Sequence, residues 1–260
     1  MKFGVVIVGD EILSGRRKDG HLAKAIELLG ERGMSLSWAR YCGDDRPLLI
    51  ETLRQSFATG DAVFSFGGIG ATPDDHTRQS AAAALGLALA LHPEAASLIN
   101  AAILARRGVE ANAQQLMMGE FPVGSAIIPN PFNQIPGFAI QNHWFLPGFP
   151  QMSWPMMAWV LDTHYAHLHH SNPYAEDSLA VLDTNESALI DLMLSLQDRF
   201  GVTVFSLPNL GSETVPRHID LGAKGTPEAV AEAMIAMRAA LTQMGAPWCE
   251  LAALPVRQTS

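Results

Sequence analysis

Charge is scarce in this 260-residue chain, and positive charge is the scarcest. Charged residues make up 17% of the sequence, and 26 acidic against 17 basic residues give a formal net charge of -9. The one dense basic run is Arg16, Arg17 and Lys18. Because an acidic chain repels nucleic-acid phosphates and anionic lipid surfaces, the composition argues against nucleic acid and membranes as partners.

Cysteine and long apolar runs are also nearly absent. The two cysteines, Cys42 and Cys249, stand too far apart in sequence to form a metal knuckle, and so few thiols favour a reducing compartment. The apolar run at residues 3–8 is too short for a signal peptide or a membrane span, and Asp10 and Glu11 end it. We therefore expect a soluble, cytoplasmic protein with buried thiols.

Hydrophobic residues, at 48% of the chain, are plentiful enough for a sizeable core. Through the first ninety residues, apolar runs alternate with segments of helical spacing. We expect strands at residues 5–8, 36–41 and 62–66, with helices at residues 22–29, 49–57 and 78–89. This alternation predicts an α/β fold with a mostly parallel sheet and helices on both faces.

The remaining sequence predicts more elements and a second domain. We expect a strand and a hairpin at residues 126–128, 138–140 and 144–146, then a helix at residues 152–161. Residues 167–174, rich in His, Ser, Asn and Pro, are typical of a linker. After it we expect helices at residues 187–200 and 227–244 and strands at residues 202–207 and 217–221. We therefore predict one domain over residues 1–168 and a small α/β companion domain over residues 175–255.

A glycine-rich turn joins the third predicted strand to the next helix. It contains Gly67, Gly68 and Gly70, with Thr72 and Thr77 close behind. Glycines let the backbone approach a ligand closely, and a helix start presents free N–H groups to anions. The two threonine hydroxyls would add donors to a phosphate. The spacing is that of neither a Walker A loop nor a Rossmann fingerprint.

Acidic residues follow all three of the first predicted strands. Asp10 and Glu11 follow the first, Asp44 and its neighbour Asp45 the second, and Asp74 and Asp75 the glycine turn. Because parallel strands end at the same edge of a sheet, these acids predict a site there that binds phosphate through a divalent cation. Two simpler readings stay open: Asp74 charges the first turn of its helix, and the other acids are ordinary solvated loop residues.

Three motifs together resemble a known domain family. They are Gly9-Asp10-Glu11-Ile12-Leu13-Ser14-Gly15, the turn Gly43-Asp44-Asp45, and Gly67-Gly68-Ile69-Gly70 followed by Asp74-Asp75-His76-Thr77. Further matches are Asn130-Pro131, Pro136-Gly137-Phe138 and Leu146-Pro147-Gly148-Phe149-Pro150. On these residues, region 1–165 resembles the molybdopterin-binding domain of MoaB/MogA-like proteins, in the version at the N-terminus of the competence/damage-inducible protein CinA. The tail resembles the small domain that follows in that family.

The resemblance implies a three-layer α/β/α molybdopterin-binding fold that forms homo-oligomers. Its implied ligand is a pterin phosphate or a nucleotide diphosphate. In the molybdenum-cofactor members, such a domain adenylylates molybdopterin or handles its adenylylated form with Mg²⁺. In the competence-protein branch it is associated with metal-dependent cleavage of ADP-ribose-type pyrophosphates. The longer competence proteins also carry an amidase domain that deamidates nicotinamide mononucleotide; with the chain ending at Ser260, we expect that activity to be absent.

The same resemblance assigns roles to residues. It makes Asp44 and Asp75 the catalytic acids and places a weakly held Mg²⁺ on Asp10, Asp44 and Asp75. Ligand or phosphate binding is implied for the glycines and polar residues of the motifs, namely Gly9, Asp10, Glu11, Ser14, Gly67, Gly68, Gly70, Thr72, Asp74, Thr77 and Gly148.

The sequence also departs from the family pattern. Phe66 replaces a small hydroxyl residue, His21 ends a changed Asp-Thr-Asn signature, and Met152 replaces an acid. Asn133 and Gln134 add bulk where the family has Gly-Thr-Ala before a proline. Two alternatives to an enzyme therefore stay open: a non-catalytic binding or carrier module, and a scaffold with a vestigial pocket. The histidines at positions 164, 167, 169 and 170 are interpreted as solvated rather than metal-binding.

Overall fold

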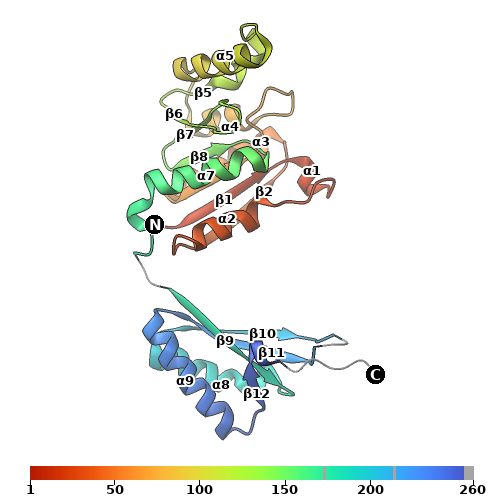
Figure 1. The fold of residues 1–260 in the computed structure, drawn as a ribbon, viewed down its shortest axis with the longest axis vertical. Helices are drawn as coiled ribbons and strands as arrows, with labels where there is room; N and C mark the ends of the chain where they lie inside the picture. Colours follow the sequence, from red (N-terminus) through yellow and green to blue (C-terminus); the bar gives the residue numbers. More distant parts are fainter. Residues whose placement is uncertain (172–173, 213–214, 255–260) are drawn as a thin grey trace. The chain divides into compact units, whose positions relative to one another are not determined.

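The computed structural model describes residues 1–171, 174–212 and 215–254, and it divides into two compact units. The first unit comprises Met1–His169, and the second begins at His170. The division falls inside the segment that its composition indicates as a linker. Each unit has its own sheet and its own hydrophobic core, and each is described by itself (Figure 1).

A six-stranded sheet forms the centre of the first unit. Its strands, in spatial order, are β2 (Leu36–Cys42), β1 (Phe3–Val8), β3 (Ala62–Phe66), β8 (His143–Leu146), β7 (Gly137–Ile140) and β6 (Ala126–Ile128). The first four are mutually parallel, and β7 and β6 extend the sheet in antiparallel fashion. Strands β1 and β3 are buried along their whole length, which explains why their sequences are continuous apolar runs.

Helices cover both faces of this sheet, so the predicted three-layer α/β/α fold is confirmed. Helices α2 (His21–Gly30) and α7 (Pro150–His164) lie side by side on one face, over Val5 and Ile7 of β1 (Figure 1). The opposite face, with Val6 and Val8, packs against the helices α3 (Arg46–Thr59), α4 (Thr77–Leu85) and α5 (Pro93–Arg107). Alternate residues of one strand thus enter two separate cores.

Several shorter elements complete the first unit. They are α1 (Asp10–Leu13), α6 (Ala113–Leu116), the paired strands β4 (Leu89–Leu91) and β5 (Glu120–Pro122), and the 3₁₀ turns Met117–Gly119 and Ala166–Leu168. Helix α4 ends at Leu85 rather than at residue 89, because Gly86 adopts the left-handed conformation that closes a helix. Helix α5 was not predicted, although Pro93 begins it and the His92 side chain accepts a hydrogen bond from the Ala95 N–H.

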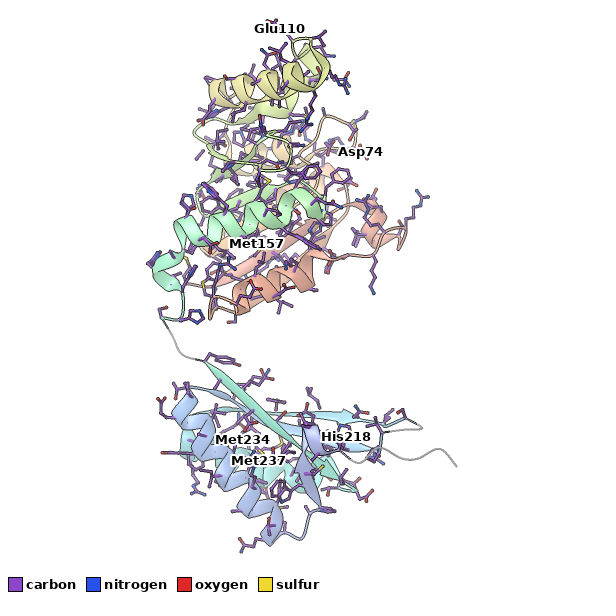
Figure 2. The ribbon with its side chains drawn as sticks, viewed as in Figure 1. Asp74, Glu110, Met157, His218, Met234 and Met237 are labelled. Carbon is purple, nitrogen blue, oxygen red and sulfur yellow. The ribbon has the colours of Figure 1, made fainter. Side chains whose placement is uncertain are left out.

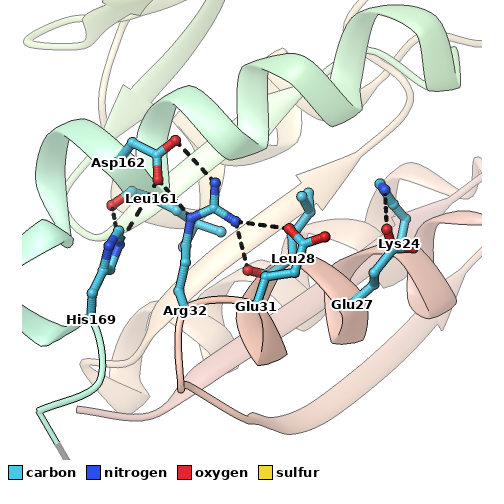
Figure 3. A network of polar contacts seen from close by, with 8 residues as sticks. All are labelled: Lys24, Glu27, Leu28, Glu31, Arg32, Leu161, Asp162 and His169. Atoms are coloured by element: carbon cyan, nitrogen blue, oxygen red, sulfur yellow. Dashed lines mark hydrogen bonds and ion pairs between the residues drawn. The ribbon is translucent and has the colours of Figure 1, made fainter.

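A network of polar contacts joins α2 to α7 on the surface of the first unit (Figure 3). The guanidinium of Arg32 donates to both carboxylate oxygens of Asp162, at 2.6 and 3.0 Å, and to the Leu28 carbonyl at 2.8 Å. His169 lies on the other side of Asp162, with 4.0 Å between the ring nitrogen and the carboxylate. The network fixes the C-terminal ends of both helices against each other.

The second unit packs two helices on one face of a four-stranded antiparallel sheet. Its strands, in spatial order, are β10 (Thr203–Asn209), β11 (His218–Gly225), β9 (Ala175–Leu182) and β12 (Trp248–Glu250). The helices are α8 (Ile190–Phe200), preceded by a 3₁₀ turn at Glu186–Leu189, and α9 (Pro227–Gln243); a further 3₁₀ turn is Leu251–Ala253. Met234 and Met237 point from α9 into the core (Figure 2).

Two expectations from composition can be compared with the structure. Cys42 is buried, Cys249 is half-buried, and both thiols are free. Among the described residues, no helix combines the length and apolar character that a membrane span requires.

Two members of the histidine cluster at positions 164–170 make contacts within the first unit. His164 packs against the rings of Trp144 and Trp159, and the ring of His169 is hydrogen-bonded to the Leu161 carbonyl.

Candidate functional site

The carboxyl ends of four parallel strands meet at one edge of the sheet. Strand β1 leads into α1, β2 leads to Asp44, β3 leads into the glycine loop, and β8 leads to Gly148. The chain continues from β1 to β2 on one side and returns to β3 on the other, so the loops diverge between β1 and β3. Such a divergence opens a crevice where α/β sheets bind ligands. The three predicted motifs therefore share one edge.

The conformation of the glycine loop requires its first two glycines. Gly67 has a φ of 100°, and a Cβ on it would lie 2.3 Å from the carbonyl oxygen of Val8. Gly68 has a φ of 69°, and a Cβ there would lie 2.2 Å from the hydroxyl of Thr77. Any side chain would therefore be strained and would clash.

Backbone amides are the hydrogen-bond donors that this loop can offer to a ligand. Within the described part of the chain, the N–H groups of Gly68, Ile69 and Gly70 have no hydrogen-bond partner, whereas Gly67 donates to the Leu146 carbonyl at 3.0 Å. A run of unpaired amides at the end of a strand is the arrangement that binds phosphate oxygens in other α/β proteins. The loop thus has the donors that the sequence motif predicts.

Both threonine hydroxyls of the motif are engaged within the loop itself. The Thr77 hydroxyl donates to the Gly67 carbonyl at 2.9 Å and is fully buried. The Thr72 hydroxyl donates to Asp75 at 2.5 Å, and its N–H donates to the same oxygen at 2.8 Å. In this arrangement the threonine hydroxyls shape the loop, and their donation to a phosphate stays a prediction.

Asp10 and Asp44 form a reciprocal pair across the ends of β1 and β2. The Asp10 N–H donates to Asp44 Oδ2 at 2.9 Å, and the Asp44 N–H donates to Asp10 Oδ1 at 3.2 Å. Each carboxylate keeps a second oxygen for another ligand. Burial raises the pKa of Asp44, and the negative charges of its acidic neighbours raise it further. A cation at this position would relieve that repulsion.

Asp75, the third predicted metal ligand, does not join this pair. Its carboxylate turns back onto its own loop, where it accepts the two bonds from Thr72 and would lie 2.4 Å from a Cβ on Gly70. Asp74 is instead the acid from this loop whose charge acts on Asp44; it projects into solvent (Figure 2). In residues 1–171, 174–212 and 215–254, no group of three or more His, Cys, Asp and Glu side chains is arranged to hold a metal ion.

A cleft lies beside this pair, along α1. It has a volume of about 470 Å³ and is lined by Asp10, Glu11, Leu13, Ser14 and Arg16. Three of these residues are predicted ligand contacts. Gly9 starts α1, and its N–H donates to the Cys42 carbonyl at 3.0 Å, which joins the ends of β1 and β2.

Arg78 supports the glycine loop from inside the protein, a role that no sequence motif indicates. Its guanidinium is buried and donates to the Gly70 carbonyl at 2.6 Å and to the Met117 carbonyl. Burial lowers its pKa, opposed by the charges of Glu120 and Asp75. The one available signal was an arginine at the start of an alanine-rich helix, directly after the motif.

The departures from the family pattern contact each other in pairs. His21 stacks on Phe66 with ring centroids 4.6 Å apart and planes 17° apart. Its Nδ1 accepts from Trp154 at 3.2 Å, so Nε2 carries the proton and donates to the Gly148 carbonyl at 3.2 Å. Burial lowers the pKa of His21. Predicted ligand residue Gly148 therefore anchors a neutral histidine through its carbonyl.

The second pair is Asn133 and Met152. The side-chain amide of Asn133 donates from Nδ2 to the Met152 sulfur at 3.4 Å, and its Oδ1 accepts from the Ile135 N–H at 2.9 Å. Gln134, between Asn133 and Ile135 in the chain, has a φ of 64°. His21, Phe66 and Asn133 are buried, so both pairs are packing contacts.

The fold and site define an α/β domain whose sheet is covered by helices on both faces and carries acidic residues and a glycine loop at its carboxyl edge. The chain belongs to the family described as the probable molybdopterin binding domain, whose model matches residues 4–167. A CinA-like protein of Syntrophotalea carbinolica is 30% identical over 155 residues, which are 58% of this chain and 37% of that protein. The chain thus matches only part of that relative.

Two further proteins are similar to the chain. A protein of Caldivirga maquilingensis is 31% identical over 73% of this chain and 74% of its own length. The solved structure described as the protein CinA with unknown function from Thermoplasma acidophilum has a TM-score of 0.55 and 26% identity. That match covers 62% of this chain and 96% of the other, and therefore corresponds to the first unit in extent.

Proposed function

We propose that the first unit binds a pterin phosphate or a nucleotide diphosphate at the carboxyl edge of its sheet. It would either hydrolyse the phosphoanhydride of the nucleotide or transfer a nucleotidyl group from a nucleoside triphosphate to the pterin phosphate, with pyrophosphate as the leaving group. One observation carries the proposal: the glycine loop with its unpaired amides and the reciprocal pair Asp10–Asp44 lie at the same carboxyl edge of the sheet. Donors for phosphate oxygens and carboxylates for a cation are thereby combined. Family membership supports the pterin, and the resemblance to competence proteins supports the nucleotide.

The residues at this edge fit a weakly held Mg²⁺. Mg²⁺ in phosphate-binding sites takes one or two carboxylates together with oxygens of the substrate, and Asp10 and Asp44 supply two carboxylates. When bound, the ion would neutralise phosphate charge and polarise a phosphoryl oxygen. The loop amides would hold the phosphate oxygens and stabilise the charge that develops on them. Asp44 would hold the ion or orient an attacking water, and the bound ion would oppose the burial and charge repulsion that raise its pKa.

The test measures turnover by chromatography with ADP-ribose, FAD, NAD and ATP, each with and without Mg²⁺ or Co²⁺. Asp44→Asn removes the carboxylate while keeping an oxygen for the Asp10 N–H, and Asp198→Asn, on the exposed face of α8, is the matched control. We expect metal-dependent cleavage that Asp44→Asn lowers at least a hundredfold and that Asp198→Asn leaves unchanged. Equal turnover in both variants would overturn the assignment of Asp44.

A second candidate is a non-catalytic carrier for the same ligands. The stacked His21 and Phe66 favour it, because their packed rings fill the wall where the family pattern has smaller polar residues. A carrier would bind ligand without metal and show no turnover, whereas a hydrolase needs the ion. If neither a pterin phosphate nor a nucleotide raised the melting temperature, the pocket would be vestigial. The homo-oligomer and the cytoplasmic location stay predictions.

A further inference from the structure

An exposed phenylalanine stands at the same edge as the candidate phosphate site. Phe149 precedes α7 as its N-cap residue, and 52% of its surface is exposed. It follows Gly148 directly, and a Cβ on Gly148 would lie 3.3 Å from the Cα of Gly67. The backbone before Phe149 is therefore in contact with the glycine loop. The ring is exposed and its neighbour Gly148 adjoins the loop, so a ligand held at the loop could stack on it.

A cation from a different loop lies over this ring. The guanidinium carbon of Arg17 is 5.6 Å from the centroid of Phe149. Arg17 is held there by its N–H, which donates to the Glu11 carbonyl at 2.9 Å, and by an ion pair with the Glu11 carboxylate at 3.6 Å. The segment after α1, which also places Arg16 in the 470 Å³ cleft, thus approaches the segment after β8.

We propose that Phe149 is the stacking surface for the planar heterocycle of the ligand, a purine or a pterin, and that Arg17 contacts the adjoining phosphate chain. This inference rests on the proposed function, because it places the phosphates at the glycine loop. Aromatic side chains stack on planar heterocycles with little dependence on the identity of the heterocycle. A guanidinium beside the aromatic ring adds a positive charge that can bind a phosphate. Leu13, exposed on α1, would offer a second apolar surface in the 470 Å³ cleft, which Arg16, the chain neighbour of Arg17, also lines.

Phe132 provides a matched comparison within the same unit. It is 61% exposed, like Phe149, but it lies in the turn between β6 and β7, on the antiparallel side of the sheet. None of the cation–ring contacts found among the described residues involves it. Substitution of either phenylalanine by alanine removes a similar exposed ring, and only one of them stands beside the glycine loop.

The test measures binding of ADP, neopterin triphosphate and inorganic pyrophosphate by calorimetry in Mg²⁺, with Phe149→Ala, Phe149→Trp and Phe132→Ala. We expect Phe149→Ala to weaken at least one of the two ring ligands by about tenfold or more, and to leave pyrophosphate within twofold. Phe149→Trp should retain ring binding, and Phe132→Ala should change nothing. Melting temperatures of the variants show that each is folded.

Other results separate the inference from the function on which it rests. If a ring ligand binds and Phe149→Ala leaves its affinity unchanged, the stacking surface is wrong while the phosphate site stands. If pyrophosphate binds and neither ADP nor neopterin triphosphate binds more tightly than pyrophosphate, the protein has no heterocycle site and the inference again fails. If none of the three binds, the proposed function itself fails, and this inference with it.

Discussion

At the scale of single residues, His143 shows how burial fixes a protonation state. It lies inside the first unit on β8, with Nε2 2.7 Å from the Ser56 hydroxyl and its ring 4.0 Å from that of Phe57. Burial lowers its pKa to about 3, opposed by the charge of Asp61. The folded protein therefore keeps this imidazole neutral at pH values where an unfolded chain would protonate it.

The free energy of unfolding should therefore decrease as the pH is lowered. The unfolded chain binds a proton at His143 below about pH 6.5 and the folded chain does not until about pH 3, so this contribution is complete above pH 6.5 and is lost on acidification. Between pH 6.5 and 5 we expect a loss of about 2 kcal/mol from this group. The double variant His143→Phe with Ser56→Ala should lack that loss in urea unfolding. Equal losses in both proteins would contradict the prediction.

Among the site residues, sequence predicted position better than orientation. Asp10, Asp44 and the glycines were placed at one edge because strand order alone decides where they lie. Asp75 and Thr77 were assigned to ligands, and the structure turns both onto their own loop through bonds that no spacing reveals. Arg78 was missed because its partners are carbonyls distant in sequence.

At the scale of elements, the glycine loop depends on one crowded position. Gly68→Ala combines a left-handed φ with a Cβ 2.2 Å from the Thr77 hydroxyl, whereas Gly60→Ala has a similar φ of 70° in open space. We expect Gly60→Ala to cost about 1 kcal/mol of strain, and Gly68→Ala to cost about 1–3 kcal/mol more from the clash. Ligand binding should be lost only in Gly68→Ala. Chemical denaturation measures the free energy of unfolding of each variant, and calorimetry measures its ligand binding. Equal losses of stability in the two variants would show that the loop accommodates a Cβ at residue 68 without a clash.

The contact between α2 and α7 gives a second prediction at this scale. The side chain of Arg32 is only 14% exposed and makes several bonds, while Arg54 forms an exposed pair with Glu51 within α3 (Figure 3 shows the Arg32 network). We expect Arg32→Ala to lower the free energy of unfolding by about 1–3 kcal/mol, and Arg54→Ala by less than about 0.5 kcal/mol. Equilibrium unfolding of both variants checks this, and similar values would mean that the Arg32 network adds no more than a surface pair.

Elements were predictable where one physical cause dominated. Strands β1 and β3 are buried on both faces, so their apolar runs identified them. Strand β9 was missed, because only its second half is buried and its first half reads as a continuation of the linker. Strand β12 and the pair β4–β5 have three residues each and show no periodic pattern, and they were not predicted; the equally short β6 was predicted from its apolar run Ala126–Ile128.

At the scale of the whole molecule, the two units have separate cores, and the site belongs to the first. Leu29 lies in the core between α2 and the six-stranded sheet, and Leu241 lies in the core between α9 and the four-stranded sheet. Both side chains are fully buried. Each replacement by alanine leaves a cavity, which costs about 2–5 kcal/mol.

These two substitutions test whether each core stabilises only its own unit. Hydrogen exchange resolved along the chain should accelerate in residues 1–169 for Leu29→Ala, and in residues 174–254 for Leu241→Ala, because local exchange follows the stability of the cooperative unit that contains the amide. Binding of pyrophosphate in Mg²⁺ should survive Leu241→Ala unchanged at a temperature where the first unit stays folded. If Leu241→Ala accelerated exchange throughout residues 1–169, the two cores would form one cooperative structure, and the proposed site would depend on the second unit for its stability.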